Sequence, residues 1–223
     1  LTRSNHPWTS QMPDPMNPAS LAPNIPEITL DQLRPIPEPW QEVSLQGCLI
    51  EASTIARRIQ DLARQIEQNA DPSTPLVVIS ILAGAAIFSS DLIRALRYPL
   101  EWTMIGLSSY REGTTSGDLH WTLPLTRDIR GQQVLIVDDI LDTGQTLQAV
   151  VEHLHTLRPA SVQTCVLLDK QISCPSDNST SARIQADHVG FQIEDAFVVG
   201  YGLDMGGQFR QLPFVATLSP RPL

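Results

Sequence analysis

The sequence predicts an α/β fold in which a mostly parallel β-sheet is flanked by helices. Short, continuous apolar runs alternate along the chain with segments of helical periodicity, and such runs are typical of strands buried on both faces. With 223 residues and a hydrophobic content of 42%, the chain is long enough to bury one full core and leaves no room for a second domain. We therefore expect ligands to bind at the carboxyl ends of the strands, where the loops gather.

The N-terminal segment differs in composition from the rest of the chain. Nine of the 18 prolines fall in residues 1–40, where Ser, Asn and Thr are also frequent. Because proline fixes φ and lacks a backbone donor, regular secondary structure is not expected there. We predict a disordered or loosely draped tail over residues 1–40 and one folded domain over residues 41–223.

The first folded elements are predicted by their apolar spacing. From position 51 onward, apolar residues recur on one face of an amphipathic helix: Ile55, Ile59, Leu62, Ala63 and Ile66. The run LVVISIL at 76–82 lies between Pro75 and Gly84 and predicts a buried strand. A helix over about 85–97 is expected to follow.

The remaining elements continue the alternation. Strands are predicted at 100–107 and 119–125, separated by SSYREGTTSGD, a polar span that we expect to be a mobile surface loop. The run VLIVD at 134–138 predicts another buried strand, followed by a helix over about 146–157. The last predicted elements are a strand at 161–169, a polar loop at 171–186, and short strands near 187–193, 197–200 and 213–218.

Charge, cysteine content and hydropathy exclude several classes of protein. The net charge of −9 and the pI near 4.9 provide no basic face for nucleic acid or an anionic membrane. The three cysteines form no CxxC pair, which suits a reducing cytosol; Cys48 and Cys165 are expected in the core and Cys174 in a polar loop. No apolar stretch approaches the roughly 18 residues that span a bilayer. We therefore expect a soluble, cytoplasmic protein with neither a nucleic-acid nor a membrane partner.

The most informative stretch is VLIVDDILDTGQT at 134–146, where a buried strand leads into three aspartates and the start of a helix. A helix N-terminus presents unpaired N–H groups and the positive end of the dipole, so Thr143, Gly144 and Thr146 are suited to bind a phosphate. Three carboxylates within five residues repel one another unless cations or hydroxyl donors lie between them, which favours Mg²⁺ or a sugar diol.

This stretch resembles the phosphoribosyl-pyrophosphate-binding motif of type I phosphoribosyltransferases. Four further segments resemble the hypoxanthine-guanine branch in order and spacing, over about residues 43–218: Leu168 to Lys170, VGF at 189–191, FVVGYGLD at 197–204, and FR at 209–210. The resemblance implies a type I phosphoribosyltransferase-like fold with a small hood and a mobile lid loop. It also implies conversion of hypoxanthine, guanine or both, with phosphoribosyl pyrophosphate, to the nucleoside 5′-monophosphate and pyrophosphate.

The resemblance assigns roles at the phosphoribosyl-pyrophosphate site. Asp138 and Asp139 are expected to engage the ribose hydroxyls and Mg²⁺, and Asp142 is expected to act as general base beside the purine N7. The 5-phosphate is expected to bind at Thr143, Gly144, Gln145 and Thr146. Contacts to pyrophosphate are expected from Ala83, Gly84 and Arg210.

The resemblance also assigns a purine pocket and a lid. Phe197 is expected to stack on the base, while the Val198 backbone and the Lys170 ammonium face its edge, so that Lys170 favours 6-oxopurines. Asp204 is expected near the purine and as a second, water-mediated Mg²⁺ position. The lid is expected to carry Ser109 and Tyr110 and to exclude water during the reaction.

The sequence departs from the family pattern at three positions. Ala83 stands where the family usually has a lysine in the pyrophosphate loop, whose main contact is made by the backbone. Gln145 replaces a common basic residue, and Asp138 replaces the usual glutamate. The missing lysine at Ala83 leaves pyrophosphate affinity open, whereas the changes at Gln145 and Asp138 are ones that other phosphoribosyltransferases tolerate. The loop at 171–186 could reshape the purine pocket.

Parts of the sequence also match other classes of protein. Asp142-Thr143-Gly144 also matches aspartic proteases, but these are all-β and pair two such triplets, and no DxDxT order supports a phosphate-transferring acidic pocket. A nucleotide-binding regulator without turnover and a branch that uses xanthine or orotate remain alternatives. The family resemblance implies a homodimer or homotetramer.

Overall fold

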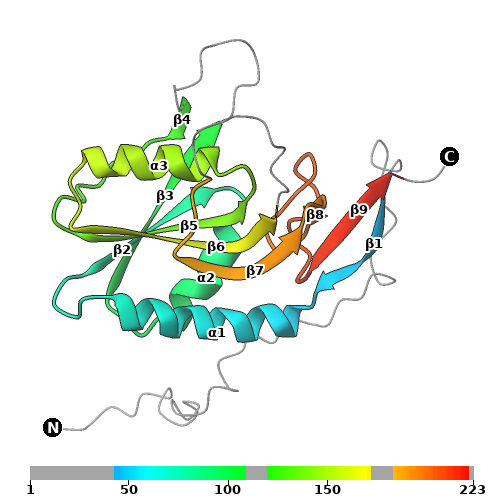
Figure 1. Cartoon of the computed structure of the whole chain (residues 1–223), viewed down its shortest axis with the longest axis horizontal. Helices are drawn as coiled ribbons and strands as arrows, with labels where there is room; N and C mark the ends of the chain where they lie inside the picture. Colours follow the sequence, from blue (N-terminus) through cyan, green and yellow to red (C-terminus); the bar gives the residue numbers. More distant parts are fainter. Residues whose placement is uncertain (1–42, 109–119, 172–182, 221–223) are drawn as a thin grey trace, which may run out of the picture.

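The computed structural model describes residues 43–108, 120–171 and 183–220 (Figure 1). The predicted tail at 1–40, the lid residues Ser109 and Tyr110, and Cys174 lie outside the described residues, as does most of the polar loop at 171–186.

A six-stranded sheet forms the centre of the molecule, with the strand order β4-β3-β2-β5-β6-β7. All neighbours are parallel except β3 and β4, which are antiparallel. The strands are β2 (Leu76–Leu82), β3 (Leu100–Ser108), β4 (His120–Leu123), β5 (Gln133–Leu141), β6 (Ser161–Gln171) and β7 (His188–Glu194). The predicted mostly parallel sheet is confirmed, and β5 continues three residues beyond the predicted end at 138.

Three helices cover this sheet, with α1 (Ala52–Asn69) and α2 (Ala86–Ala95) on one face and α3 (Gln145–Thr156) on the other (Figure 1). The two faces have separate hydrophobic cores. Along β2, Val78 packs in the core that contains α1 and α2, whereas Val77 and Ile79 pack in the core that contains α3. The continuous apolar run at 76–82 therefore reflects burial on both faces.

A second, three-stranded antiparallel sheet has the order β1-β9-β8 and lies beyond the carboxyl ends of the central strands (Figure 1). Its strands are β1 (Val43–Ile50), β8 (Val198–Val199) and β9 (Val215–Pro220). This sheet is the predicted hood. The sequence analysis assigned no strand to residues 43–50.

The cysteine predictions had mixed outcomes. Cys165 is buried on β6, as predicted. Cys48 is exposed on β1, so its expected place in the core is wrong. Apolar neighbours in the sequence did not bury Cys48, because β1 pairs only with β9 at the edge of the small sheet.

The described helices include none that is both long enough and apolar enough to cross a membrane.

Candidate active site

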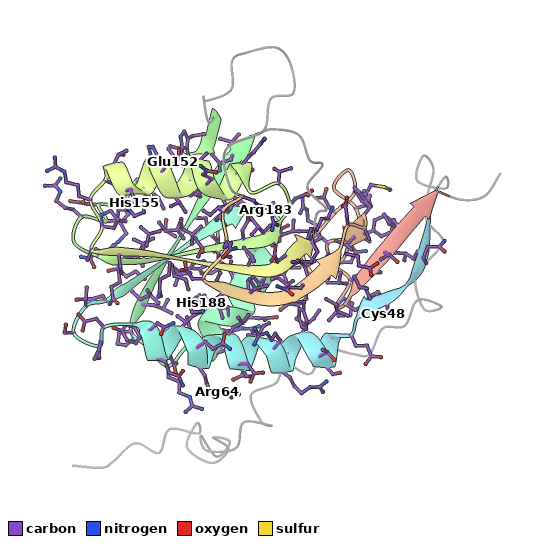
Figure 2. The ribbon with its side chains drawn as sticks, in the orientation of Figure 1. Cys48, Arg64, Glu152, His155, Arg183 and His188 are labelled. Atoms are coloured by element: carbon purple, nitrogen blue, oxygen red, sulfur yellow. The ribbon has the colours of Figure 1, made fainter. Side chains whose placement is uncertain are left out.

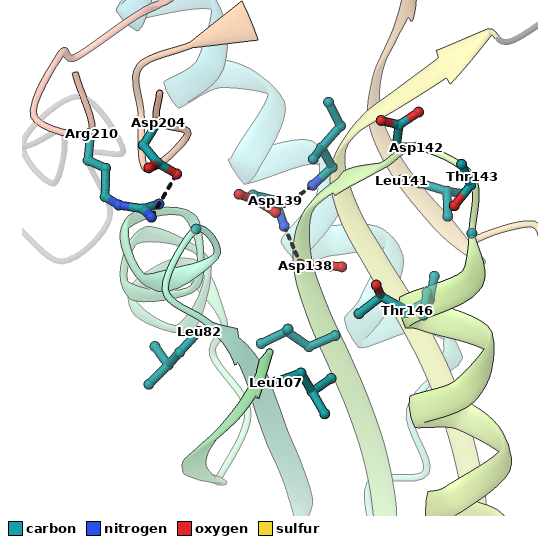
Figure 3. A pocket seen from close by; sticks show the side chains of 15 residues that line it. Leu82, Leu107, Asp138, Asp139, Leu141, Asp142, Thr143, Thr146, Asp204 and Arg210 are labelled. Atoms are coloured by element: carbon teal, nitrogen blue, oxygen red, sulfur yellow. Dashed lines mark hydrogen bonds and ion pairs between the residues drawn. The ribbon is translucent and has the colours of Figure 1, made fainter. Parts of the chain in front are cut away.

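One cavity of about 330 Å³ lies at the carboxyl end of β5, and the segment between β8 and β9 lines it with Asp204 and Arg210 (Figure 3). It gathers nine of the residues that sequence analysis assigned to substrate or metal, which are Gly84, Asp138, Asp139, Asp142, Thr143, Gly144, Thr146, Asp204 and Arg210. Ala83, Gln145, Lys170, Phe197 and Val198 are not among the residues that line it. The cavity therefore brings together most of the residues expected to bind the ribose and phosphates, whereas the residues expected to bind the purine do not line it.

Asp138 and Asp139 are the last charged residues before β5 ends, and their carboxyl groups are both withdrawn from solvent. Burial, followed by the negative charge of Asp139, raises the pKa of Asp138 well above its usual value. Burial also raises the pKa of Asp139, although the charge of Arg210 acts in the opposite direction. Two adjacent buried carboxylates of this kind are suited to bind a cation or hydroxyl donors.

The loop after β2 supplies backbone to the opposite side of these carboxylates. A Cβ atom added at Gly84 would lie 1.6 Å from Asp139 Oδ2, so the carboxylate occupies the space that any side chain at position 84 would need. The Leu82–Ala83 peptide bond is cis. The loop thus brings main-chain atoms against Asp139 where the sequence predicted a backbone contact with pyrophosphate.

The turn between β5 and α3, here called the phosphate loop, contains the residues predicted to bind the 5-phosphate. Gly144 has φ of 85° and precedes the first residue of α3, a left-handed conformation that glycine adopts without steric cost. Gly144 has no side chain to cap this helix end, and the Thr143 hydroxyl accepts a long hydrogen bond of 3.5 Å from the Gln145 N–H at the first position of α3. Thr143 and Thr146 line the cavity, whereas the exposed Gln145 does not.

Asp142 and Lys170 meet across the ends of β5 and β6. Asp142 is 53% exposed at its side chain, and its Oδ2 lies 3.5 Å from the Lys170 ammonium. Lys170 also pairs with Asp195 Oδ1 at 3.3 Å, and its own side chain is only 12% exposed. A buried lysine stem therefore holds its charge between two carboxylates at the mouth of the site.

The small sheet and the loop after it supply the remaining candidates. Phe197, just before β8, is 53% exposed, and Val198 is buried. Arg210 pairs with Asp204 Oδ1 at 2.7 Å and also donates to the Gly202 carbonyl at 2.5 Å (Figure 3). Phe197 thus presents an open aromatic surface, while Arg210 and Asp204 form the wall of the cavity opposite Asp142.

Comparison with known proteins identifies the family. The model of the phosphoribosyl transferase domain matches residues 49–205. The hypoxanthine-guanine phosphoribosyltransferase of Mycobacterium avium is 38% identical over 183 residues, covering 79% of this chain and 87% of its own length. That of Aquifex aeolicus is 40% identical over 168 residues, covering 75% and 91%. The chain belongs to the hypoxanthine-guanine phosphoribosyltransferase family.

Solved structures agree with this assignment. A hypoxanthine-guanine phosphoribosyltransferase from Bacillus anthracis has a TM-score of 0.69 at 32% identity and covers 79% of this chain and 99% of its own. A hypoxanthine phosphoribosyltransferase from Trypanosoma cruzi has a TM-score of 0.70 at 37% identity, with coverage of 78% and 92%. The family resemblance and the type I phosphoribosyltransferase fold are both confirmed.

Within this phosphoribosyltransferase, the structure adds residues that sequence analysis did not single out. Asp195 is the second partner of Lys170, and Arg183 bonds to the backbone of the phosphate loop from the end of the polar segment at 171–186. Arg183 also pairs with Asp169, next to Lys170 in the chain. No local motif marks these contacts, because each joins residues that are distant in sequence.

Proposed function

We propose that this protein transfers the 5-phosphoribosyl group of phosphoribosyl pyrophosphate to hypoxanthine, guanine or both, releasing pyrophosphate. The relatives named as hypoxanthine and hypoxanthine-guanine phosphoribosyltransferases support this purine-salvage activity. The observation that carries it is the joining of two buried carboxylates, Asp138 and Asp139, to the N-terminus of α3 in one cavity. A sugar hydroxyl pair and a phosphate on one substrate match these two features.

The 5-phosphate of the substrate binds in this proposal at Thr143, Gly144, Gln145 and Thr146. Backbone N–H groups at the start of α3 donate to the phosphate oxygens, and the helix dipole favours the negative charge. Gln145, which replaces a basic residue, contributes through its backbone because its side chain is exposed and does not line the cavity. The backbone at Ala83 and Gly84, together with the Arg210 guanidinium, holds the pyrophosphate.

Mg²⁺ fits the chemistry of this donor set. Asp138, Asp139 and Asp204 offer only oxygen atoms, and a cation would favour the ionised form of Asp138, whose pKa is raised first by burial and then by the negative charge of Asp139. Among the residues described, no group of three or more His, Cys, Asp and Glu side chains could hold a metal ion alone. Mg²⁺ commonly keeps waters and binds substrate phosphates, so the ion would be shared with the substrate and would neutralise charge on the pyrophosphate.

Asp142 is the proposed general base. In the reaction, the purine N9 forms a bond to C1′ of the ribose, the bond from C1′ to the pyrophosphate oxygen breaks, and the proton on N7 passes to the Asp142 carboxylate. The neighbouring Lys170 keeps this carboxylate at the mouth of the site. Positioning of the two substrates by the two halves of the cavity supplies much of the remaining acceleration.

The purine binds in this proposal between Phe197 and the Lys170 ammonium. The exposed aromatic ring of Phe197 offers a stacking surface, and the Val198 backbone lies next to it in the chain. Lys170 can donate to a 6-oxo group but not to the 6-amino donor of adenine, which favours 6-oxopurines. Asp204 is proposed to contribute from the other wall of the cavity, and Ser109 and Tyr110 are proposed to close the site.

The proposed activity is tested by mixing the protein with phosphoribosyl pyrophosphate and hypoxanthine, guanine, xanthine or orotate in turn, and measuring pyrophosphate release with and without Mg²⁺. Metal-dependent release with hypoxanthine or guanine is expected. Release only with xanthine or orotate would assign another branch. Failure with every base, together with retained nucleotide binding, would favour a regulator without turnover.

The proposal extends to the surroundings of the enzyme. We place it in the cytoplasm, as the cysteine pattern suggests, and expect a homodimer or homotetramer with no nucleic-acid or membrane partner. Light scattering after size-exclusion chromatography measures the assembly directly.

A further inference from the structure

We propose that Arg183 is a positioning residue that fixes the backbone of the phosphate loop, and this inference rests on the proposed function. Arg183 belongs to the segment between β6 and β7 and lies where β5 turns into α3 (Figure 2). Its guanidinium donates to the Leu141 carbonyl and to the Asp142 carbonyl, each at 2.7 Å. Both acceptors belong to residues that line the candidate active site.

The same guanidinium is also anchored by a carboxylate. Arg183 Nη2 lies 2.7 Å from Asp169 Oδ1, and the two side chains are only 25% and 12% exposed. Asp169 Oδ2 in turn accepts a hydrogen bond from Gln171 at 3.2 Å. A guanidinium has a fixed, planar set of donors, so a carboxylate that fixes its position also fixes the two carbonyls that it holds.

The aliphatic part of the side chain packs on the phosphate loop as well. A Cβ atom added at Gly144 would lie 2.9 Å from Ile184 Cγ2 and 3.3 Å from Arg183 Cγ. Residues 183–184 therefore lie directly against the glycine that precedes α3 and cover the loop on that side.

The hydrogen bonds from Arg183 to two carbonyls also orient N–H groups of the loop. In a planar trans peptide, the C=O and N–H bonds point in opposite directions. When Arg183 holds the carbonyls of Leu141 and Asp142, the N–H groups of Asp142 and Thr143 are directed away from the guanidinium. Arg183 thus sets the orientation of two peptide planes at the start of the loop that is proposed to bind the 5-phosphate and to carry the general base.

Another arginine in the molecule provides a matched control. Arg58 on α1 also donates to two backbone carbonyls, those of Val189 and Gly190, and is likewise partly buried. Its contacts lie on β7, and neither acceptor lines the candidate active site. Substitution of Arg58 therefore removes the same number of backbone contacts without touching the phosphate loop.

The experiment compares wild type, Arg183→Met, Arg183→Lys and Arg58→Met by thermal unfolding, by steady-state kinetics, and by calorimetric titration with inosine 5′-monophosphate. Arg183→Met is expected to raise the KM for phosphoribosyl pyrophosphate about tenfold and to weaken the nucleotide by a similar factor, the scale of one hydrogen bond to a charged group. The KM for hypoxanthine is expected to change by less than about twofold, because the loop contacts the sugar phosphate. Arg183→Lys keeps the charge but loses the planar set of donors, and it is expected to weaken the same two quantities by only about threefold.

Arg58→Met is expected to lower the Tm while leaving both KM values unchanged. The proposal is overturned if Arg183→Met lowers the Tm and leaves the KM for phosphoribosyl pyrophosphate and nucleotide binding at wild-type values, since that is the control's behaviour. If Arg183→Met does not fold, Asp169→Asn tests the same contact by removing only the charge that anchors the guanidinium. An unchanged nucleotide affinity in that variant would also overturn the proposal.

The proposed function and the proposed role of Arg183 can be refuted separately. A wild-type protein that binds inosine 5′-monophosphate without turnover would refute the proposed function, while the calorimetric comparison would still test Arg183. A wild-type protein that binds neither the nucleotide nor phosphoribosyl pyrophosphate would refute both.

Discussion

The two halves of the candidate active site are built in different ways. The proposed ribose-phosphate half lies on the central sheet, where Asp138 is only 8% exposed and the backbone at Gly84 and Gly144 fits closely against its neighbours. In the proposed purine half, Phe197 is 53% exposed and the Lys170 ammonium is held at 3.3 and 3.5 Å by two carboxylates that are themselves exposed. One half is fixed by backbone and burial, and the other by side chains at the mouth of the site.

This difference explains how each half can work. A phosphate with a fixed shape is well served by preorganised N–H groups, which need no rearrangement when the ligand binds. A purine pocket assembled from the end of β6 and the edge of the small sheet can be altered without disturbing the central core. Substitutions in the two halves should therefore separate effects on phosphoribosyl pyrophosphate from effects on the base.

The largest effect is expected where the two halves meet, at Asp142. Asp142→Asn keeps the size of the side chain but removes the proton acceptor, so kcat should fall by about 10²-fold or more. The KM for phosphoribosyl pyrophosphate should change little, because Asp142 is not assigned to the phosphate. Steady-state kinetics with hypoxanthine measure both quantities.

Asp195→Asn is the control for this substitution. It removes the other carboxylate partner of Lys170 while leaving Asp142 in place. A near-normal kcat for Asp142→Asn, or an equal loss in Asp195→Asn, would contradict the assignment of Asp142 as general base.

A somewhat smaller effect is expected from the backbone of the phosphate half. In Gly84→Ala, the added Cβ would meet the Asp139 carboxylate at 1.6 Å, so the carboxylate must leave the position in which it also accepts from the Ile140 N–H. The KM for phosphoribosyl pyrophosphate should rise about 30-fold, equivalent to roughly 2 kcal/mol. In Gly47→Ala, the added Cβ would meet nothing within 4 Å, and this variant should behave as wild type. Wild-type kinetics in Gly84→Ala would contradict the close packing of Gly84 against the Asp139 carboxylate.

The sequence predicted the central sheet and the grouping of the aspartates with the start of α3 well, because both depend on local patterns. The apolar runs at 76–82 and 134–138 became β2 and β5, and the residues after the second run lie in one cavity. A strand, a turn and a helix start are consecutive in the chain, so their relative positions follow from local geometry. The aspartates and Gly144 were therefore placed together without knowledge of the tertiary structure.

The parts that could not be predicted depend on contacts between distant residues. Strand β1 pairs only with β9, whose residues lie 177 positions away at the Val43–Pro220 pair and 165 at the Ile50–Val215 pair, and its own sequence shows no strict alternation. The contact of Arg183 with the phosphate loop spans more than 40 residues, as its separations of 41 and 42 positions show. Local periodicity contains no information about such pairs.

The purine half gives a more moderate effect, and it should be selective. Lys170→Met keeps most of the length of the buried side chain but removes the donor proposed to read the 6-oxo group, so the KM for hypoxanthine or guanine should rise about tenfold. The KM for phosphoribosyl pyrophosphate should stay within about twofold of wild type, because the phosphate loop is separate. Equal increases in both KM values would argue that Lys170 supports the whole site rather than the base.

The smallest expected change is in the free energy of unfolding. Substitution of Asp138 is expected to raise it, whereas the substitutions above impair catalysis or binding. Because burial and the charge of Asp139 raise the pKa of Asp138, the folded state binds a proton more tightly than the unfolded state does. The free energy of unfolding therefore falls as the pH rises from the usual aspartate pKa to the raised one, and the penalty is complete above the raised value. Asp138→Asn removes this penalty and retains the oxygen that accepts from the Asp139 N–H.

Without ligands at pH 8, Asp138→Asn should unfold at a Tm about 5 °C above wild type, which corresponds to relief of about 1–2 kcal/mol in a chain of this size. The difference should shrink as the pH falls towards the usual aspartate pKa of 3.8, and it should vanish below that value, where the wild-type carboxyl group is protonated in both states. Asp142→Asn serves as the reference, because Asp142 is 53% exposed and its substitution relieves no buried charge. A Tm at or below that of wild type at pH 8 would show that the ionised Asp138 carboxylate does not destabilise the folded protein without ligands, which contradicts the prediction.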